Sequence, residues 1–567
     1  MVKKNVLFLF LGCLLVFSFW SLTVRPAGAQ ATFTQITVDQ ANAMIDSNPS
    51  LVILDVRNQS EYDTYHLRNA LLIPVWNLTQ NLGELNKNDS ILVYDATGAL
   101  SANASGTLVS NGFQYVYDML EGINGWIAAG YPVFVVYTSI QTAIENATAG
   151  QTIYVSSGLY NESLTVDKPI TLVGENASTT EINASTCVLN VQGDNVSFSD
   201  FTIRYTGCTC YGYCSVNVTN GHNVNVTDNT IISDDYGIRV AGSTGVTVGD
   251  DDVVRAADAS LVVSNSSAVS VFGNSLPSNL DGVEIDNAND STFWNNTVMA
   301  NLTGLYMAES FGNTFFNNNI SSATLMGLSI SSDYNNTFFD NNVYSMSAAA
   351  LFLWQSSTNS FFRNNFYENS YVQIYSNDNS TDSFDNGVEG NYWCNYTGVD
   401  SNHDGISATP YVIDSTQYHR LVDNFPLMGP IFSFNTSLGI EVNVISNSSV
   451  NDFNYLPSNN TVTFQISNTT AGQTVGFCRI SIPHSLISPA NGTISVIIDN
   501  GQTPVLFLNS TVYDDGVSRW IYFTYQLTTH SVTISTIPEF PAFLILALFM
   551  AITILATAAN KRKRVGL

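Results

Sequence analysis

The stretches DSTFWNNTV (Asp290–Val298), GNTFFNNNI (Gly312–Ile320) and NNTFFDNNV (Asn335–Val343) are three versions of one nine-residue pattern. Eight segments carry it, and they start at residues 195, 223, 245, 268, 290, 312, 335 and 358. Their fourth and ninth residues are apolar, and the seventh is usually Asn. A repeat of about 22 residues with short β-type segments predicts a β-helix, in which inward Phe, Val and Ile stack into one core. The Asn column predicts a ladder of side-chain hydrogen bonds.

The segments on either side of the repeats narrow the choice of fold. The Leu spacing of leucine-rich repeats is missing, and a propeller blade needs about 40 residues. On the N-terminal side, SIQTAI (139–144) and GLYNE (158–162) resemble the cap and first rung of pectate-lyase-like right-handed β-helices. On the C-terminal side, GNYW (390–393) and DSNHDG (400–405) resemble the closing segment of NosD-type proteins. The resemblance implies a right-handed parallel β-helix over residues 138–430.

Residues 32–135 follow a different pattern. Short apolar stretches alternate there with helical ones, which favours a small α/β domain with a parallel sheet. The motifs LDVR (54–57), HLRNA (66–70) and LEG (120–122), followed by Trp126, resemble the rhodanese family at separate points. That resemblance implies the fold of the family's sulfurtransferases for this part of the chain.

One departure from the rhodanese pattern concerns the reaction itself. Asp95 stands where the family has its catalytic cysteine, and Leu100 stands where its loop usually has an arginine. A carboxylate cannot carry a sulfane sulfur, because that chemistry needs a polarizable thiolate. An acid among backbone N–H donors is stable, so the fold can persist without the reaction. We therefore expect a module without sulfurtransferase activity, kept for its structure, for a partner or for a different ligand in the same loop.

Both ends of the chain carry segments typical of an exported and anchored protein. Residues 1–31 have the basic start, apolar run and small-residue cleavage site of a secretory signal peptide. Residues 540–559 are uncharged and long enough to cross a membrane, and the basic tail 560–567 predicts a cytoplasmic end. The motif PEF (538–540) before this span resembles the PEF-type sorting signals of archaeal surface proteins. The resemblance implies either a retained anchor or a tail that a sorting enzyme removes.

The charge agrees with an extracellular location and excludes one class of partner. The 567 residues contain 46 Asp and Glu but 18 Lys and Arg, which gives a formal net charge of −28. Such a surface repels phosphate backbones, so nucleic-acid binding is excluded. About two dozen Asn-x-Ser/Thr triplets indicate a glycoprotein.

Residues 431–535 alternate apolar and polar positions, as in IEVNV (440–444) and WIYFTY (520–525). Several such strands separated by Gly, Asn and Pro turns predict a β-sandwich, which we interpret as a stalk. The whole chain is thus predicted to be multidomain. It runs from a signal peptide through a rhodanese-like α/β domain, a parallel β-helix solenoid and a β-sandwich to a transmembrane helix.

One outward row of the predicted β-helix is aromatic. Because side chains alternate along a strand, the fifth position of each repeat points outward where the fourth points inward. On five successive coils the fifth residues are Phe272, Trp294, Phe316, Phe339 and Phe362. Stacked at about 4.8 Å, they form a continuous apolar strip. The strip is either a platform that binds sugar rings or a hydrophobic partner, or it is a surface that another part of the chain covers.

Acidic residues on the same solenoid leave an enzymatic interpretation open. Hydrolysis of a polysaccharide needs two carboxylates. Asp235 and Asp281 are the first candidates to supply them, from a set of acids that also includes Asp234, Asp250, Asp251, Asp252, Glu284 and Asp286. Lyase chemistry instead needs a Ca²⁺ site and a basic residue, and basic residues are scarce in this region. The alternative is that these acids are solvated turn residues.

The residues Asp400, Asn402 and Asp404, followed by Gly405, have the spacing of a Ca²⁺-binding loop with oxygen ligands at positions 1, 3 and 5. Later ligand positions of such loops lack oxygen side chains here. Calcium is therefore one interpretation of this segment, and a plain Asx-rich turn is the other.

Cysteine spacing predicts one disulfide. Cys187 lies 8 residues before the repeat that starts at residue 195, and Ser215 lies 8 residues before the repeat that starts at residue 223. Cys187 is therefore expected to stack next to Cys214 on the adjacent coil, near disulfide range. A soft-metal site is the alternative. The NosD-type family carries a copper-binding label, but the 6 His residues are scattered through this chain and do not support it.

These observations predict a surface-anchored extracellular protein that binds carbohydrate or a cell-envelope polymer through the β-helix face. Two alternatives remain: a polysaccharide lyase or glycoside hydrolase that uses the β-helix acids, and a structural spacer of the envelope. An exposed aromatic strip separates the binding protein from the spacer. Two carboxylates about 5–10 Å apart in one groove favour the enzyme.

Overall fold

The computed structural model describes residues 32–207, 214–345, 349–367, 372–376, 381–414, 421–468, 475–487, 493–499, 505–508, 512–526 and 529–537. The chain divides into two compact units, one up to Val135 and one from Val136 onward. The predicted signal peptide, PEF motif, membrane span and basic tail lie outside the described residues. Within the described residues, no helix has both the length and the apolar composition needed to span a membrane.

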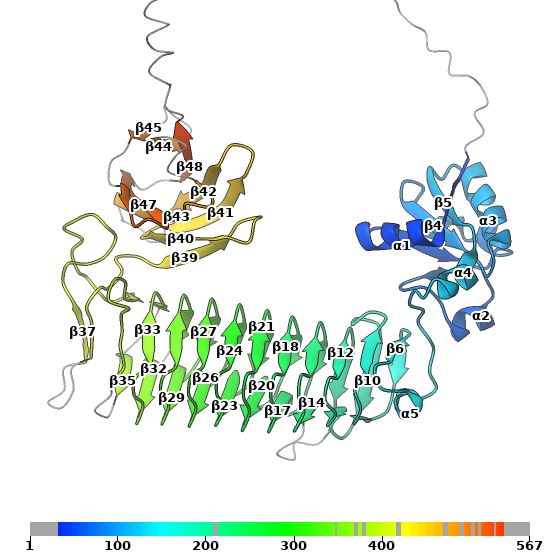
Figure 1. Ribbon diagram of the computed structural model, residues 1–567, viewed down its shortest axis with the longest axis horizontal. Coiled ribbons are helices and arrows are strands. Elements are labelled where there is room, and N and C mark those ends of the chain that lie inside the picture. Colours follow the sequence, from blue (N-terminus) through cyan, green and yellow to red (C-terminus); the bar gives the residue numbers. More distant parts are fainter. Residues whose placement is uncertain are drawn as a thin grey trace, which may run out of the picture. The chain divides into compact units, whose positions relative to one another are not determined.

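The first unit is a parallel five-stranded sheet in the order β1-β5-β4-β2-β3, with helices on its faces (Figure 1). Its strands are β1 (Thr34–Ile36), β2 (Val52–Asp55), β3 (Leu71–Leu72), β4 (Ser90–Tyr94) and β5 (Tyr115–Met119). Its helices are α1 (Val38–Ser47), α2 (Gln59–Thr64), α3 (Ala99–Ser110) and α4 (Gly122–Ala128), with short 3₁₀ turns at Leu78–Gln80 and Leu82–Glu84.

The sheet of this unit is buried on both faces, as parallel sheets are. Ile91 and Val93 of β4 pack on one side with Leu108 of α3. Leu92 and Tyr94 of the same strand pack on the other side, in a cluster that includes the α4 residues Ile123 and Trp126. This alternation explains why the strand reads as an unbroken apolar run. The predicted α/β domain is confirmed.

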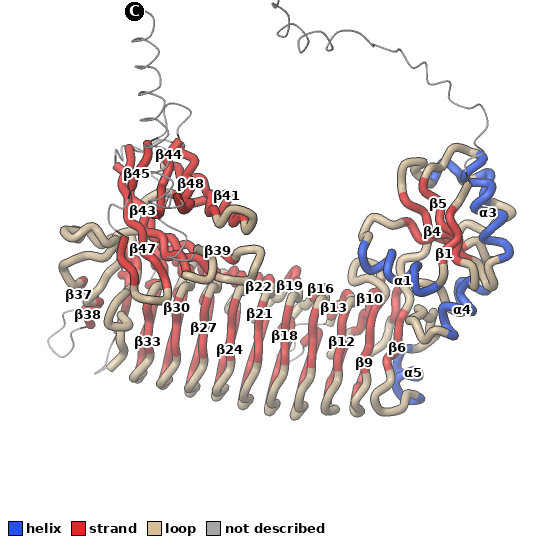
Figure 2. The backbone as a smooth tube through the Cα atoms, turned by 45° about the horizontal axis from the view of Figure 1, so that its top comes forward, coloured by secondary structure: helices blue, strands red, loops and turns tan. Residues whose placement is uncertain are grey.

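The second unit begins with helix α5 (Ile140–Asn146), whose buried Ile140 and Ile144 close one end of a parallel solenoid. Ten successive coils of the described chain each place one strand in each of three parallel sheets, and the second sheet has one strand more. Figure 2 shows the coils side by side. The first sheet comprises β6 (Thr152–Val155), β9 (Thr171–Gly174), β12 (Ser197–Ser199), β15 (Asn225–Thr227), β18 (Thr247–Gly249), β21 (Ser270–Phe272), β24 (Thr292–Trp294), β27 (Thr314–Phe316), β30 (Thr337–Phe339) and β33 (Ser360–Phe362).

The other two sheets complete each coil. The second sheet comprises β7 (Gly158–Tyr160), β10 (Thr180–Ala184), β13 (Thr202–Tyr205), β16 (Thr230–Ile232), β19 (Asp252–Arg255), β22 (Ser275–Ser278), β25 (Thr297–Ala300), β28 (Asn319–Ser322), β31 (Asn342–Ser345), β34 (Asn365–Tyr367) and β36 (Tyr392–Trp393). The third comprises β8 (Leu164–Val166), β11 (Leu189–Val191), β14 (Cys214–Thr219), β17 (Tyr236–Ala241), β20 (Leu261–Ser264), β23 (Val283–Asp286), β26 (Thr303–Ala308), β29 (Met326–Ser331), β32 (Ala349–Trp354) and β35 (Val372–Ser376). The predicted parallel β-helix is confirmed.

Two repeating columns hold the coils together. The fourth residues of the repeats face inward, and the rings of Phe293, Phe315, Phe338 and Phe361 stack in succession at 4.6–4.9 Å. The seventh residues form the predicted ladder. The side-chain oxygen of Asn318, for example, accepts the backbone N–H and the amide N–H of Asn296, both at 3.0 Å.

One member of the ladder is an acid. Asp251 lies between Asn229 and Asn274, and its Oδ1 accepts the backbone and side-chain N–H groups of Asn229 at 2.8 and 3.0 Å. Its Oδ2 is buried and has no hydrogen-bond partner in the part of the chain that the structure describes. Burial raises the pKa of this carboxyl well above its ordinary value of 3.8.

We expect Asp251→Asn to stabilise the solenoid by about 1–3 kcal/mol near neutral pH, because the new amide can donate as Asn274 Nδ2 does to Val248 O. A raised folded-state pKa gives stability that is present below the unfolded pKa, near 3.8, and lost as the pH rises through the folded pKa. The gain from Asn is therefore larger at about pH 8 than at about pH 4. Urea unfolding of both chains at the two pH values measures it; a gain that is equal at both, or absent, contradicts this account.

After the solenoid, the hairpin β37 (Tyr411–Asp414) and β38 (Leu421–Asp423) leads to two antiparallel five-stranded sheets. One contains β39 (Ile431–Asn435), β40 (Glu441–Ser446), β43 (Val475–Pro483), β47 (Ser518–Gln526) and β46 (Val512–Asp514). The other contains β41 (Ser449–Leu456), β42 (Thr461–Ser467), β48 (His530–Ile537), β44 (Thr493–Asp499) and β45 (Val505–Leu508). Buried residues of both sheets share one core. The predicted β-sandwich is thus confirmed in part, since several connections lie outside the described residues.

Candidate functional site

The loop after β4 surrounds Asp95 with backbone donors. Asp95 is only 2% exposed, and its two carboxylate oxygens accept the N–H groups of Gly98 and Leu100. Gly98 has φ +94°, and a Cβ at this position would lie 1.8 Å from the carbonyl oxygen of Leu120. Glycine is thus required for the tight entry into α3, and the loop is folded closely around a carboxylate.

Asp55 and Arg57, the two charged residues of the LDVR motif, stabilise the fold of this unit. Arg57 Nη2 lies 2.6 Å from Asp55 Oδ2, both side chains are buried, and the same nitrogen donates to Tyr65 O at 2.7 Å. The LDVR motif therefore joins β2 to the segment after α2. Beside the Asp95 loop, Ser101 donates to Asp118 at 2.6 Å, while burial raises the pKa of Asp118.

The five aromatic residues predicted to form an outward strip do lie in one row. Strand register pairs each with the next, from Phe272 on β21 to Phe362 on β33. Their successive ring centroids are 4.7, 6.0, 5.2 and 5.5 Å apart, and the rings lie within 20° of parallel. Each side chain is half-buried, because its faces contact the neighbouring rings while its edge remains accessible. We call this row the aromatic strip: Phe272, Trp294, Phe316, Phe339 and Phe362.

A row of hydroxyl groups runs beside the aromatic strip. On each strand the residue two positions earlier also points outward and is Ser or Thr. This hydroxyl row consists of Ser270, Thr292, Thr314, Thr337 and Ser360. At the C-terminal end of the strip, Arg363 Nη2 lies 2.8 Å from Asp340 and 3.6 Å from Glu441. The first sheet therefore presents an apolar row with polar groups along its side and at its end.

The acids predicted for an enzymatic site, Asp235 and Asp281, both lie near a further acid, Asp258, and their catalytic role stays a prediction. Asp281 is coupled electrostatically to Asp258, and Glu284 of β23 is coupled to both. Burial, followed by the charges of Asp258 and Asp281, raises the pKa of Glu284 to about 7. Asp235 is nearly fully buried, and its backbone carbonyl accepts the N–H of Asp258 at 3.3 Å.

Asp258 is the member of this group that sequence reasoning missed. Asp235, Asp258 and Asp281 follow one another at intervals of 23 residues, the period of the repeat itself. That interval was the signal that could have found it. The group of Asp258, Asp281 and Glu284 is called the acid group below.

The predicted calcium loop uses its carboxylates for its own turn. Asp400 accepts the backbone N–H groups of Asp404 and Gly405 at 3.1 and 2.9 Å, and Asp404 accepts that of Ile406 at 2.9 Å. Asn402 donates to Asp404 at 2.7 Å. This is the pattern of an Asx-rich turn. Calcium at Asp400, Asn402 and Asp404 stays a prediction.

The structure places Cys187 and Cys214 side by side on adjacent coils, as predicted. Their sulfur atoms are 3.5 Å apart, whereas a disulfide bond is about 2 Å long. The contact with Cys214 lowers the pKa of Cys187 to about 6. The disulfide stays a prediction, and Cys208 and Cys210 lie outside the described residues.

Comparison with known proteins agrees with both folds. A family model described as "Periplasmic copper-binding protein (NosD)" matches residues 144–324 and 189–398, so the NosD-type solenoid is confirmed. Among the described residues, no three His, Cys, Asp or Glu side chains come together to hold a metal.

A second family model, described as "Rhodanese-like domain", matches residues 37–129. The thiosulfate sulfurtransferase GlpE of Coxiella burnetii is 35% identical over 78 residues, which are 14% of this chain and 73% of that protein. The chain belongs to the rhodanese family. A further relative matches the same rhodanese domain. YrkF of Bacillus subtilis is 31% identical over 96 residues, 17% of this chain and 52% of its own length.

The solved structures that match include proteins described as rhodanese-related or rhodanese-like. A rhodanese-related protein from Thermoplasma volcanium has 28% sequence identity and a TM-score of 0.17, and the match covers 18% of this chain and 100% of that one. The chain spans about half the length of YrkF and 26% of the tRNA uridine(34) hydroxylase of Photorhabdus laumondii, to which it is 32% identical over 94 residues. The rhodanese family membership therefore rests on the N-terminal unit alone.

Proposed function

We propose that this protein is held at the outer cell surface by residues 540–559 and binds a polysaccharide or another cell-envelope polymer along the aromatic strip. The NosD and rhodanese matches fit an extracellular protein. The PEF motif favours an archaeal surface protein. The observation that carries the proposal is the unbroken row of five stacked rings on the first sheet.

The geometry of the strip suits a linear polymer of sugars. The C–H faces of sugar rings pack on aromatic side chains, and a row that continues over five coils offers several such contacts in line. The adjacent hydroxyl row can exchange hydrogen bonds with the sugar hydroxyls. An apolar row of this length at the protein surface also indicates an interaction site, because exposed apolar patches mark such sites.

The strip makes a direct prediction. Trp294→Ala or Phe316→Ala is expected to weaken retention of the full-length chain on its polysaccharide about tenfold, because each change removes a central contact of the row. Trp354→Ala is the matched control, since Trp354 is an exposed tryptophan on β32 of the third sheet. Retention on a panel of immobilised polysaccharides measures the effect. Equal retention of the Trp294 and Trp354 variants contradicts binding through the strip.

We further propose that the rhodanese domain does not transfer sulfur. The seven cysteines of the chain all lie outside residues 32–135, and Asp95 holds the loop that a persulfide would need. Incubated with thiosulfate and cyanide, the full-length chain is expected to form no thiocyanate above the uncatalysed rate, with GlpE as the positive control. Thiocyanate formation that a thiol-blocking reagent abolishes contradicts this.

A glycoside hydrolase is the second candidate, and one observation favours it. Glu284 has a pKa raised to about 7, so it is protonated below neutral pH, next to two carboxyls of the acid group. A protonated carboxyl beside an ionised one is the pairing that glycoside hydrolysis uses. This candidate places catalysis on the third sheet, away from the aromatic strip on the first.

A further inference from the structure

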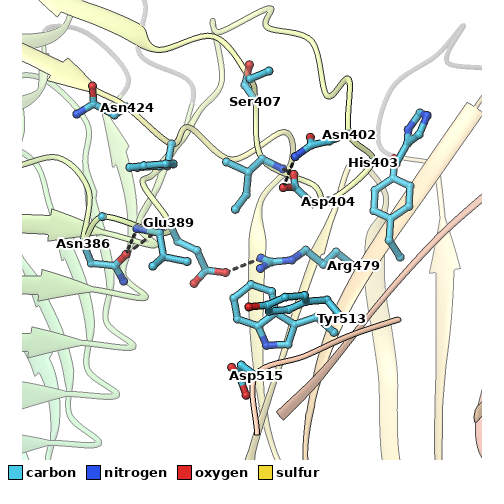
Figure 3. Close-up of a pocket in the computed structure, with 17 residues that line it drawn as sticks. Asn386, Glu389, Asn402, His403, Asp404, Ser407, Asn424, Arg479, Tyr513 and Asp515 are labelled. Atoms are coloured by element: carbon cyan, nitrogen blue, oxygen red, sulfur yellow. Dashed lines mark hydrogen bonds and ion pairs between the residues drawn. The ribbon is translucent and has the colours of Figure 1, made fainter. Parts of the chain in front are cut away.

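A cavity lies where the C-terminal end of the solenoid meets the two-sheet β domain of the same unit. Its volume is about 880 Å³, within the range of pockets for small ligands. The solenoid contributes the loops 386–389 and 402–408, and the β domain contributes residues of β43, β46 and β47. Figure 3 shows the labelled side chains of both parts around it.

Alternation along β43 directs Arg479 into this cavity. Cys478 and Ile480 belong to the core of the β domain, so Phe477 and Arg479 point the other way, toward the end of the solenoid. Arg479 is 4% exposed, and its Nη1 lies 2.5 Å from Glu389 Oε1, an ion pair drawn in Figure 3. Its guanidinium carbon lies 3.8 Å from the ring centre of Trp520.

The second nitrogen of this guanidinium is unsatisfied. Arg479 Nη2 is buried and has no hydrogen-bond partner within the described residues. A buried donor on a charged group costs free energy unless an acceptor meets it. An oxygen atom of a ligand in the cavity would supply the acceptor that this nitrogen lacks.

The walls of the cavity combine flat aromatic surfaces with amides. Trp520 and Tyr522 belong to β47. Tyr513 of β46 lies edge-on to Trp520, with the two ring centroids 5.8 Å apart, and its side chain is 63% exposed. Amide side chains line the opposite wall, from Asn386 and Asn424. Aromatic faces with amide donors and acceptors between them match the two kinds of surface on a sugar ring.

The charges of the lining decide against an anionic ligand. Three carboxylate side chains line the cavity, those of Glu389, Asp404 and Asp515, whereas the lining contains one guanidinium side chain, that of Arg479. The chain as a whole carries a net charge of −28. An acidic sugar or a phosphate would be repelled, whereas a neutral ligand rich in hydroxyl groups can donate to the carboxylates and accept from Arg479.

We propose that this cavity binds a neutral oligosaccharide, at a site separate from the aromatic strip. The ligand hydroxyl oxygen accepts from Arg479 Nη2, and a sugar face packs on the aromatic wall at Tyr513 and Trp520. The chain then has two places for sugar: an open row along the first sheet and an enclosed pocket at the solenoid's end. Because the pocket is enclosed, it can hold the end of a polysaccharide chain or a short glycan.

Calorimetric titration of the full-length chain tests this site. The probes are neutral hexasaccharides of glucose, mannose, galactose and N-acetylglucosamine, with hexagalacturonate as the acidic counterpart. A neutral probe is expected to bind, and Tyr513→Ala is expected to weaken its affinity about tenfold, because the exposed ring supports the ligand and not the fold. Tyr334→Ala, at another exposed tyrosine, is expected to leave that affinity unchanged. Because a neutral hexasaccharide can also bind along the aromatic strip, both tyrosine changes are made in a chain that already carries Trp294→Ala.

Four results overturn the proposal. They are the absence of binding by every neutral probe, binding by hexagalacturonate alone, an affinity that Tyr513→Ala leaves unchanged, and an affinity that Trp294→Ala removes. The last of these supports the strip and rejects the pocket. Binding that persists in the Trp294→Ala chain and that Tyr513→Ala weakens supports the pocket, whatever the outcome for polymer binding along the strip.

Discussion

Replacing Phe338 by Ala is expected to lower the free energy of unfolding by about 3–5 kcal/mol. Phe338 is 1% exposed, and its ring stacks between Phe315 at 4.6 Å and Phe361 at 4.9 Å. Removing it leaves a cavity in a column whose neighbours are fixed by their own coils and cannot close it. Both stacking contacts are lost together with the buried apolar area.

The next residue provides the matched control for Phe338. Phe339 lies on the same strand, is also Phe and also stacks in a row, but its side chain points outward and is half-buried. Phe339→Ala is expected to cost less than about 1 kcal/mol and to weaken polysaccharide retention, while Phe338→Ala reduces stability. Urea unfolding of the full-length chain measures both. Equal losses from the two changes would mean that the outward row is part of the core.

Asn318→Ala is expected to destabilise the solenoid by about 3–5 kcal/mol, more than most polar-to-Ala changes. Asn318 Oδ1 accepts two N–H groups of Asn296, and its Nδ2 donates to Phe293 O at 2.9 Å and to Asn341 Oδ1 at 2.9 Å. All of these groups are buried inside the turn, where water cannot replace the lost partner. Each unsatisfied group costs about 1–3 kcal/mol.

The control for the ladder is again the adjacent residue. Asn319 is exposed, and its side chain accepts one hydrogen bond, from Asn342 at 2.7 Å. Asn319→Ala is therefore expected to cost less than about 1 kcal/mol in thermal or urea unfolding. Should both asparagines cost the same, the ladder contributes nothing beyond an ordinary surface hydrogen bond.

Periodicity is what made the solenoid predictable. The fourth, fifth and seventh positions of the repeat foretold the inward ring column, the outward strip and the Asn ladder, because one period governs all coils. Asp258 followed the same period and was overlooked, since its neighbours in sequence carry no motif. In the rhodanese domain, short motifs at separate points identified the fold, and the LDVR motif forms a buried ion pair between Asp55 and Arg57.

The cavity at the solenoid's end could not be predicted in this way. Glu389 and Arg479 are 90 residues apart in sequence, and neither belongs to a repeat. Their contact depends on how the last coil meets β43, which is a matter of tertiary packing. From the sequence alone, an arginine on a strand is expected to be exposed to solvent. The structure shows instead that Arg479 is buried against Trp520.

The measurement that tests the central account most directly combines retention and cleavage. The full-length chain is incubated with each polysaccharide of the panel at about pH 6, where the carboxyl of Glu284 is protonated. Bound polymer and newly released reducing ends are then quantified in the same sample. The account predicts retention that Trp294→Ala weakens, with no reducing ends above background. Release of reducing ends that Glu284→Gln abolishes would contradict it and make the acid group the active site of a glycoside hydrolase.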